Sequence, residues 1–185
     1  MPTPHLELVT EQLADRQRWW RIADPSWTDP VDAGYAAVGG GRWNPPGSWP
    51  TLYLNEDIVT ARLNLQLFTS AWPYEPEDLR PEHAPTLAAV TLPRRQHVVD
   101  VHSPSGVTAA GLPATYPLDR LGNLVPHPVC HTVGQRAHAD GRRGIRCRSA
   151  TSPLGEGREL AWYPATSRSR ATVIETLEFA DWYWR

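Results

Sequence analysis

Residues 39–64 constrain the chain more than any other segment, because their composition changes four times over a short distance. The three glycines at positions 39–41 allow positive φ and a close approach of the backbone to a ligand. Prolines then stiffen the connection that follows. Residues 51–54 have the composition of a short buried strand, and a stripe of apolar residues at helical spacing comes after them. The segment therefore predicts a glycine loop, a stiff turn, a strand and a helix in succession.

Arg42 and Trp43 follow the glycines directly, so a guanidinium stands beside a large flat ring. Arginine suits bidentate binding of phosphate. Trp43 or Tyr53 could either stack on an aromatic ring of a ligand or pack beneath the loop. These residue types favour a charged, nucleotide-like ligand, although the same composition also fits a surface loop that buries one tryptophan.

Length and charge bound the remaining choices. A chain of 185 residues fits a single domain with a full core, so we expect one domain over residues 1–185. A net charge of −2 disfavours a general binder of polyanions, and we expect no direct binding to nucleic acid. No apolar run approaches the roughly 18–20 residues that cross a bilayer, so no membrane partner is expected. Two cysteines and no recognisable signal peptide favour a cytoplasmic protein.

Periodicity and turn signals predict more strands than helices, which indicates the α+β class. We expect helices at residues 5–18, at 58–68 after an N-cap at Asn55, and at 129–139. The expected strands are residues 17–23, 51–54, 86–92, 97–101, 144–147, 160–163 and 171–181. Residues 24–38, 72–85 and 103–125 have loop compositions.

Two further groups of residues are weighed against simpler interpretations. His127, Cys130, His131 and Cys147 carry enough nitrogen and sulfur for a zinc site, but adjacent helical residues do not share a face, so no metal is expected. Four arginines between positions 142 and 148 alternate with apolar residues, which predicts a strand with a solvated arginine face. Binding of a partner protein to that face stays open.

The central segment resembles the signature of the RES-domain family, the toxins of RES–Xre toxin–antitoxin pairs, named for an Arg, a Glu and a Ser. The matching positions are Gly40-Gly41-Arg42-Trp43-Asn44, Gly47, Pro50 and Leu52-Tyr53-Leu54, then Trp20-Arg21-Ile22 and Asp29-Pro30 upstream and Gly144-Ile145 through Ser149 downstream. The resemblance spans most of the chain. It implies an ADP-ribosyltransferase-like split β-sheet core with flanking helices.

The resemblance also implies an activity and partners. NAD+ would be the substrate, cleaved at the nicotinamide–ribose bond with water or inorganic phosphate as acceptor. An Xre-type antitoxin would occlude the cleft, and homo-oligomerisation is left open. The implied catalytic residues are Arg42, Ser149 and whatever occupies the family's glutamate position. The implied binding residues are Arg21, Arg42, Trp43, Tyr53 and His131.

The chain departs from the family at the glutamate, which the family carries on the helix eleven residues after the tyrosine. Counted from Tyr53, that position holds Asn64. Cleavage develops positive charge on the ribose, and a fixed negative charge beside it stabilises the transition state more than the ground state. Asparagine keeps the hydrogen bonding and loses the charge, a loss that costs on the order of 10²–10³-fold in rate. We therefore expect a site that binds NAD+ and turns it over slowly.

Several alternatives stay open, including whether the chain is an enzyme at all. A shifted helix could let Glu56 supply the charge. The chain could be a weakened, differently specialised or detoxified relative. It could instead be a non-catalytic nucleotide-binding or protein-interaction module on the same fold, or it could transfer ADP-ribose to a protein.

Overall fold

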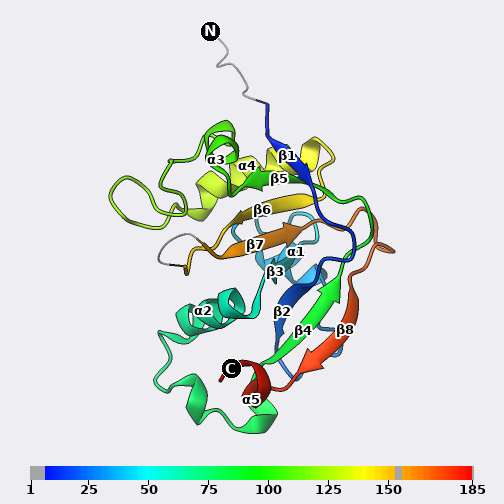
Figure 1. Cartoon of the computed structure of the whole chain (residues 1–185), viewed down its shortest axis with the longest axis vertical. Helices are drawn as coiled ribbons and strands as arrows, with labels where there is room; N and C mark the ends of the chain where they lie inside the picture. Colours follow the sequence, from blue (N-terminus) through cyan, green and yellow to red (C-terminus); the bar gives the residue numbers. More distant parts are fainter. Residues whose placement is uncertain (1–6, 153–155, 185) are drawn as a thin grey trace.

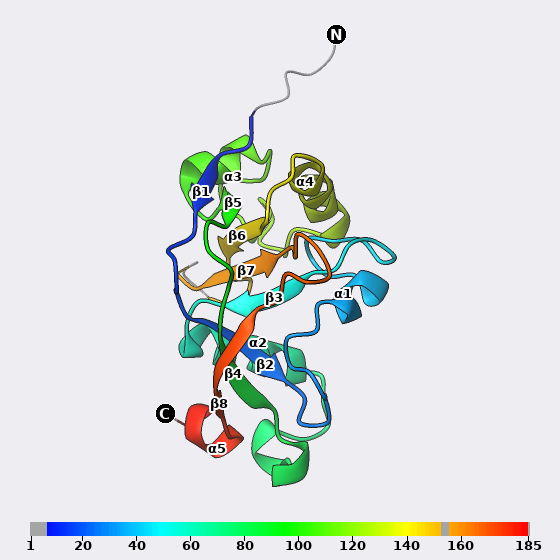
Figure 2. The ribbon, with the colours of Figure 1, turned by 90° about the vertical axis from the view of Figure 1, so that its right-hand side faces the viewer.

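The computed structural model describes residues 7–152 and 156–184, and within them eight strands form one mixed sheet (Figures 1 and 2). The strands are β1 (Thr10–Gln12), β2 (Trp19–Ala23), β3 (Leu52–Asn55), β4 (Thr86–Thr91), β5 (His97–Val101), β6 (Gly144–Arg148), β7 (Arg158–Trp162) and β8 (Thr172–Leu177). The helices are α1 (Gly34–Gly39), α2 (Ile58–Thr69), α3 (Pro104–Ala109), α4 (His127–Ala139) and α5 (Phe179–Trp182), with two 3-10 turns, η1 (Pro76–Asp78) and η2 (Pro81–His83). The α+β class expected from the sequence is confirmed.

The strand order is β1-β5-β6-β7-β3-β2-β4-β8, and all neighbours are antiparallel except the parallel pair β5 and β6. At the middle of this order, β2 and β3 are in register only at Trp20 and Asn55. The two halves of the sheet separate beyond that pair, as the split core implied by the RES resemblance requires.

Helices cover the two halves of one sheet face separately. In Figure 1, α3 and α4 lie over β5 and β6 at the top, while α2 lies beside β2 and β3 lower down. Under α3 and α4 is a core that includes Val99, Val107, Val133 and Ile145. A second cluster joins α2 and α5 to β4 through Ala61, Leu65, Leu87 and Trp182. The opposite face holds a third cluster that includes Trp19, Leu52, Leu54, Leu160 and Trp162.

Helix α2 begins at Ile58 as expected, but its N-cap is two residues later than predicted. Asn55 is the last residue of β3, and the N-cap is Asp57, whose side chain accepts a hydrogen bond of 2.7 Å from the Thr60 backbone. Ala61 and Leu65 are buried as the apolar stripe predicts. Phe68, expected to continue the stripe, is 71% exposed, because the buried face of the last turn passes through Thr69 instead.

Other expectations were wrong where pairing between distant segments overrides local pattern. In place of the helix expected at residues 5–18, the described part of that segment contains the three-residue edge strand β1, which pairs with β5. Residues 5 and 6 lie outside the described ranges. The strand expected at 171–181 ends at Leu177, because the chain turns there into α5 and buries Trp182.

Helices α1 and α3 lie in segments expected to be loops. Helix α3 is set by Ser103, whose side chain accepts from the Gly106 backbone, and by Pro104 at its first position. None of the helices in the described ranges has the length and apolar character needed to cross a membrane.

Candidate functional site

The glycine loop is tied to β3 through the hydroxyl of Tyr53. That oxygen accepts a hydrogen bond of 2.9 Å from the Trp43 backbone N–H and donates one of 2.7 Å to Oδ1 of Asn44. Asn44 is fully buried and donates in turn to the Ala36 carbonyl at 2.6 Å. Burial raises the pKa of Tyr53, so the phenol stays protonated. Tyr53, which was predicted from the sequence to bind the ligand, therefore holds the loop in place through its hydroxyl.

Gly41 approaches the Tyr53 ring too closely for any side chain. A Cβ at position 41 would lie 2.4 Å from the tyrosine hydroxyl oxygen. The absence of a side chain is therefore a requirement of packing, since the backbone there is not in the left-handed region.

Trp43 packs beneath the loop, which is the second of the two roles considered from the sequence. Its side chain is 1% exposed, and Nε1 donates to Sγ of Cys147 at 3.3 Å. The ring has no free face to stack on a ligand, so the expected direct contact with a dinucleotide is wrong in this structure. The buried Trp43 ring instead anchors the backbone of the glycine loop to the core.

Arg42, next to Trp43 in the loop, is half-buried. Its Nη1 donates to the Val125 carbonyl at 3.1 Å. Burial disfavours the charge on Arg42, but nearby Tyr116, Cys130 and Cys147 outweigh it and raise the pKa of the guanidinium. Within the described residues it forms no ion pair with a carboxylate.

Arg21 spans the split in the sheet. From β2 it donates with Nη1 to the Tyr53 carbonyl at 3.0 Å, and its guanidinium lies 5.3 Å from the centre of the Trp27 ring. Burial lowers the pKa of Arg21 to about 10, so the side chain remains charged near neutrality. Its Nε is buried and unpartnered among the described residues. Like Arg42, Arg21 forms no ion pair with a carboxylate in the described ranges, so both arginines carry unneutralised positive charge.

His131 joins α4 to the glycine loop. Its Nε2 lies 2.8 Å from the Gly41 carbonyl, to which it donates. One helical turn further on, Gly134 packs so closely on the loop that a Cβ there would lie 1.8 Å from the Trp43 carbonyl oxygen. The structure therefore gives His131 the role of supporting the loop.

Asn64 is the centre of a hydrogen-bonded network that connects four segments of the chain. Its Nδ2 donates to Oδ1 of Asn55 at 2.6 Å and to Oε1 of Glu159 at 3.0 Å. Its Oδ1 accepts from the Thr151 hydroxyl at 2.9 Å, and Thr151 lies 2.8 Å from the hydroxyl of Ser149. The structure thus brings the predicted residues Asn64 and Ser149 together through Thr151.

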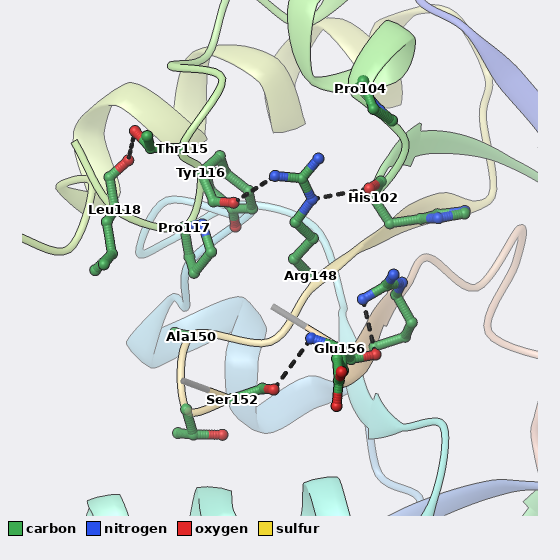
Figure 3. A pocket seen from close by; sticks show the side chains of 12 residues that line it. His102, Pro104, Thr115, Tyr116, Pro117, Leu118, Arg148, Ala150, Ser152 and Glu156 are labelled. Carbon is green, nitrogen blue, oxygen red and sulfur yellow. Dashed lines mark hydrogen bonds between the residues drawn. The ribbon is translucent and has the colours of Figure 1, made fainter. Parts of the chain in front are cut away.

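An open cavity of about 640 Å³ adjoins this network (Figure 3). Thr151 belongs to both, and Tyr116 lies between the cavity and Arg42. The remaining lining residues are His102, Pro104, Thr115, Pro117, Leu118, Arg148, Ala150, Ser152, Glu156 and Arg158. The volume falls in the range of pockets that hold small-molecule ligands.

The arginine face predicted for β6 is not solvated. Arg148 points between two loops in Figure 3 and donates to the carbonyls of His102, Ala114 and Tyr116 at 2.8, 3.1 and 2.9 Å. Arg146 forms ion pairs with Glu11 and Glu56. Both guanidiniums are bound to acceptors within the protein, so they connect neighbouring segments and are not free to bind a ligand.

Comparison with known proteins decides the family. The chain matches the RES domain over residues 18–180. It belongs to the RES-domain family. No curated protein was found to match the chain. Among solved structures it is similar to a chain in the crystal structure of the M. tuberculosis MbcT–MbcA toxin–antitoxin complex, with a TM-score of 0.72 and 20% identity over 95% of this chain and 92% of that one.

In this RES domain, three of the polar residues that meet at Asn64 were not predicted from the sequence: Asn55, Thr151 and Glu159. Glu159 directly precedes the apolar residues from which a strand was predicted, so its polarity at a strand end was the one available signal. Glu56, considered as an alternative source of charge, instead pairs with Arg146 and accepts from Gln17 at 3.2 Å. It has no place in the Asn64 network.

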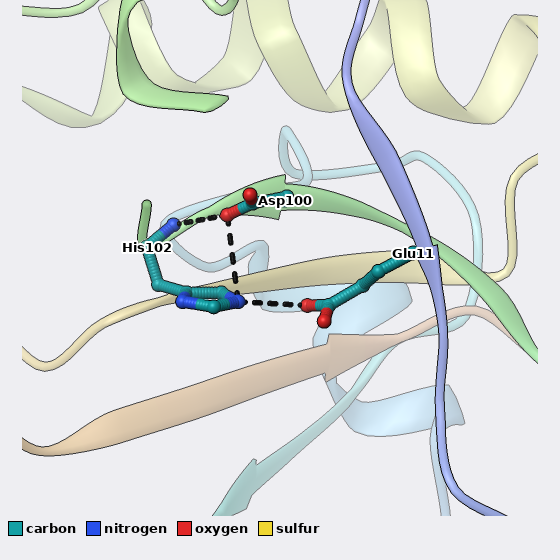
Figure 4. A group of neighbouring side chains, drawn as sticks. All are labelled: Glu11, Asp100 and His102. Carbon is teal, nitrogen blue, oxygen red and sulfur yellow. Dashed lines mark hydrogen bonds and ion pairs between the residues drawn. The ribbon is translucent and has the colours of Figure 1, made fainter. Parts of the chain in front are cut away.

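Elsewhere in the RES domain, the described residues bring three metal-type ligand atoms within 4.8 Å of one another only at Glu11, Asp100 and His102 (Figure 4). His102 Nε2 lies 2.9 Å from Oε1 of Glu11 and 3.4 Å from Oδ1 of Asp100. Arg146 contacts the second Glu11 oxygen at 3.1 Å. These groups neutralise one another and connect β1 to β5 and β6.

Proposed function

We propose that this RES domain is the toxin of a toxin–antitoxin pair and that it consumes NAD+ by cleaving the nicotinamide–ribose bond. Its family membership and its fold similarity to a chain of a toxin–antitoxin complex support the pairing with an antitoxin. An Xre-type protein is the partner class that the central motif favours. The ligand and the reaction are supported by the chemistry of the site.

The observation that carries the proposal is the pair of guanidiniums beside Tyr53. Arg21 and Arg42 are partly buried and charged, and neither has a carboxylate partner in the described part of the chain. Positive charge held away from water without a counterion is unfavourable unless an anion binds. A pyrophosphate supplies two negative charges with the oxygen geometry that arginine recognises. NAD+ brings such a pyrophosphate between its two ribose groups.

The proposed reaction needs little covalent chemistry from the protein. The bond between ribose C1′ and the pyridinium nitrogen breaks, and its electron pair leaves with neutral nicotinamide. The ribose then carries oxocarbenium charge until water or phosphate adds at C1′. Hydrolysis thus yields ADP-ribose, nicotinamide and a proton. The hydroxyls of Thr151 and Ser149 are suited to hold the ribose hydroxyls, and Asn64 positions the Thr151 hydroxyl by accepting its hydrogen bond.

A second candidate function is a nucleotide-binding module without turnover. Asn64 favours it, because the helix position that would carry a carboxylate in the family is neutral here. Such a module would bind NAD+ through the same arginines and leave it intact. Transfer of ADP-ribose to a protein would be detected as labelled protein after incubation with labelled NAD+.

The test is NAD+ consumption and nicotinamide release by the purified protein, with and without phosphate. We expect consumption by the native chain and its loss in Arg42→Ala, with NAD+ binding weakened in parallel. Arg168→Ala is the matched control, since Arg168 is exposed and remote from Tyr53 in the sequence. Expression of the native chain should arrest growth, and co-expression of its antitoxin should relieve the arrest. A native chain that binds NAD+ without consuming it favours the second candidate, and one that does neither contradicts both.

A further inference from the structure

The carboxylate of Glu159 lies beside Asn64 and on the same face of the sheet as Tyr53. In the antiparallel pairing of β3 and β7, Asn55 is opposite Glu159 and Tyr53 is opposite Ala161. In the pairing of β6 and β7, Cys147 is opposite Glu159. Residues directly opposite in adjacent strands share a face. The side chains of Asn55, Glu159 and Cys147 therefore lie side by side across three strands, next to the tyrosine that holds the glycine loop.

Glu159 is poorly compensated for a carboxylate that is only partly exposed. Its one hydrogen bond in the described part of the chain is the bond from Asn64 to Oε1. No arginine or histidine among those residues forms an ion pair with it. A carboxylate removed from bulk water is costly when it lacks a cation or several hydrogen bonds. A ligand with positive charge would relieve that cost.

The field of this carboxylate reaches the region of Arg42. Besides burial, which is the largest cause, the charge of Glu159 raises the pKa of both Cys147 and Tyr116. Arg42 opposes it at the same two groups. Arg42 and Glu159 therefore act with opposite sign on the same two buried side chains. A pair of opposite charges is complementary to a ligand with a pyrophosphate at one end and a cationic ribose at the other.

Asn64 and Glu159 are complementary in a way that two carboxylates would not be. The amide donates to Glu159, whereas a glutamate at position 64 would place a second negative charge against it. The amide orientation is fixed by this network, since Oδ1 receives the Thr151 hydroxyl on the other side. The negative charge of this part of the site is therefore on β7, and α2 supplies a neutral donor that orients it.

We propose that Glu159 is the catalytic carboxylate of this chain, facing the nicotinamide ribose and stabilising its oxocarbenium charge in place of an acidic residue at position 64. This inference rests on the proposed NAD+ cleavage. Asn64 is then a positioning residue, which holds the Glu159 carboxylate through Nδ2.

The experiment compares the native chain with Glu159→Gln, Asn64→Glu and the double variant that carries both substitutions. For each protein, kcat and KM for NAD+ cleavage, the Kd of NAD+ and the thermal unfolding midpoint are measured. Glu175→Gln is the matched control, because Glu175 is also a strand glutamate, it lies on the edge strand β8 away from β7, and its partner is the exposed Arg18.

We expect Glu159→Gln to lower kcat on the order of 10²–10³-fold while the Kd changes only a few-fold, since the charge acts mainly on the transition state. The double variant should recover at least a tenth of the native kcat, because it returns one carboxylate to the opposite side of the same hydrogen bond. Asn64→Glu alone should gain nothing, since its two carboxylates repel. A purely structural role of Glu159 would lower the unfolding midpoint without this separation of kcat from Kd and without recovery in the double variant.

The failures of the two proposals are distinguishable. Native consumption of NAD+ that persists at full rate in Glu159→Gln would overturn the role of Glu159 and leave the proposed function standing. An inactive native chain that becomes active in Asn64→Glu would show that the charge is needed at position 64, and Glu159 would again be excluded. If none of the four proteins binds or cleaves NAD+, both proposals fall together.

Discussion

Nε2 of His131 lies 2.8 Å from the carbonyl oxygen of Gly41, so the first turns of α4 hold the glycine loop at its backbone. Replacing His131 with alanine should lower the free energy of unfolding by about 0.5–1.5 kcal/mol, the usual worth of one such hydrogen bond. It should also raise the Kd of NAD+, because the loop that carries Arg42 loses a support. Urea denaturation and titration with NAD+ measure the two effects. Thr132→Ala on the same turn is the control, and equal values for both variants would contradict the supporting role.

We predict that the hydroxyl of Tyr53 contributes to the stability of the folded protein, because it holds the glycine loop. Tyr53→Phe leaves the Trp43 N–H and the Asn44 oxygen without their partner in a buried layer. Unsatisfied buried groups cost about 1–3 kcal/mol, and we expect a loss of that size in urea denaturation. Tyr35→Phe, at a residue 73% exposed, should change stability by less than about 0.5 kcal/mol. A similar small change in Tyr53→Phe would show that the hydroxyl is dispensable.

Gly134 is predicted to tolerate no side chain. Alanine would normally favour a helix, but the added Cβ would meet the Trp43 carbonyl oxygen at 1.8 Å, so α4 must move away from the loop. We expect Gly134→Ala to lower the free energy of unfolding by about 1–3 kcal/mol or more, as overpacking does. Gly39→Ala is the matched control, since nothing lies within 4 Å of its added Cβ. Thermal unfolding of the two variants decides, and equal midpoints would contradict this packing.

The Glu11–Asp100–His102 cluster predicts how stability responds to acid. Burial raises the pKa of Glu11, but the His102 hydrogen bond and the charge of Arg146 outweigh it and hold the pKa below the ordinary 4.5. At Asp100, burial likewise opposes hydrogen bonds from Ser103 and His102, and the pKa falls below 3.8. A lowered folded pKa contributes stability that is complete above the unfolded pKa and is lost as pH falls through the folded pKa.

We therefore expect Glu11→Gln to be less stable than the native chain at neutral pH and to lose less stability on acidification from about pH 5 to about pH 3. Urea denaturation at a series of pH values measures this slope. Glu178→Gln, at an exposed residue, should keep the native slope. Parallel curves for the native chain and Glu11→Gln would show that the ion pairs of Glu11 do not contribute to folding.

Local pattern was sufficient where an element is determined by its own residues. Strand β5 and helix α2 were predicted nearly to their ends, because each carries its periodicity within one short segment. Strand β1 was not, since three residues at a sheet edge owe their conformation to pairing with β5 across more than 80 positions. The order of the sheet, with β7 between β6 and β3, likewise depends on contacts that no window of sequence contains.

The candidate site divides in the same way. Arg42, Tyr53 and Asn64 lie within one continuous segment, so their motif could be recognised in the sequence. Glu159 contacts Asn64 from 95 residues away, and nothing in its own neighbourhood distinguishes it from an ordinary strand glutamate. The sequence therefore showed that a charge was absent from position 64, and only the fold shows which carboxylate stands beside it.

A Cβ at position 41 would lie 2.4 Å from the Tyr53 hydroxyl oxygen, so the residues at positions 41 and 53 can change only together. An alanine at 41 is compatible only with a smaller residue at 53, and that residue would lack the oxygen that Asn44 and Trp43 share. The effects of changing both positions should be far from additive, since each substitution alters the space that the other needs. A library that randomises the glycine loop while keeping the tyrosine will therefore yield folded proteins almost exclusively with glycine at 41.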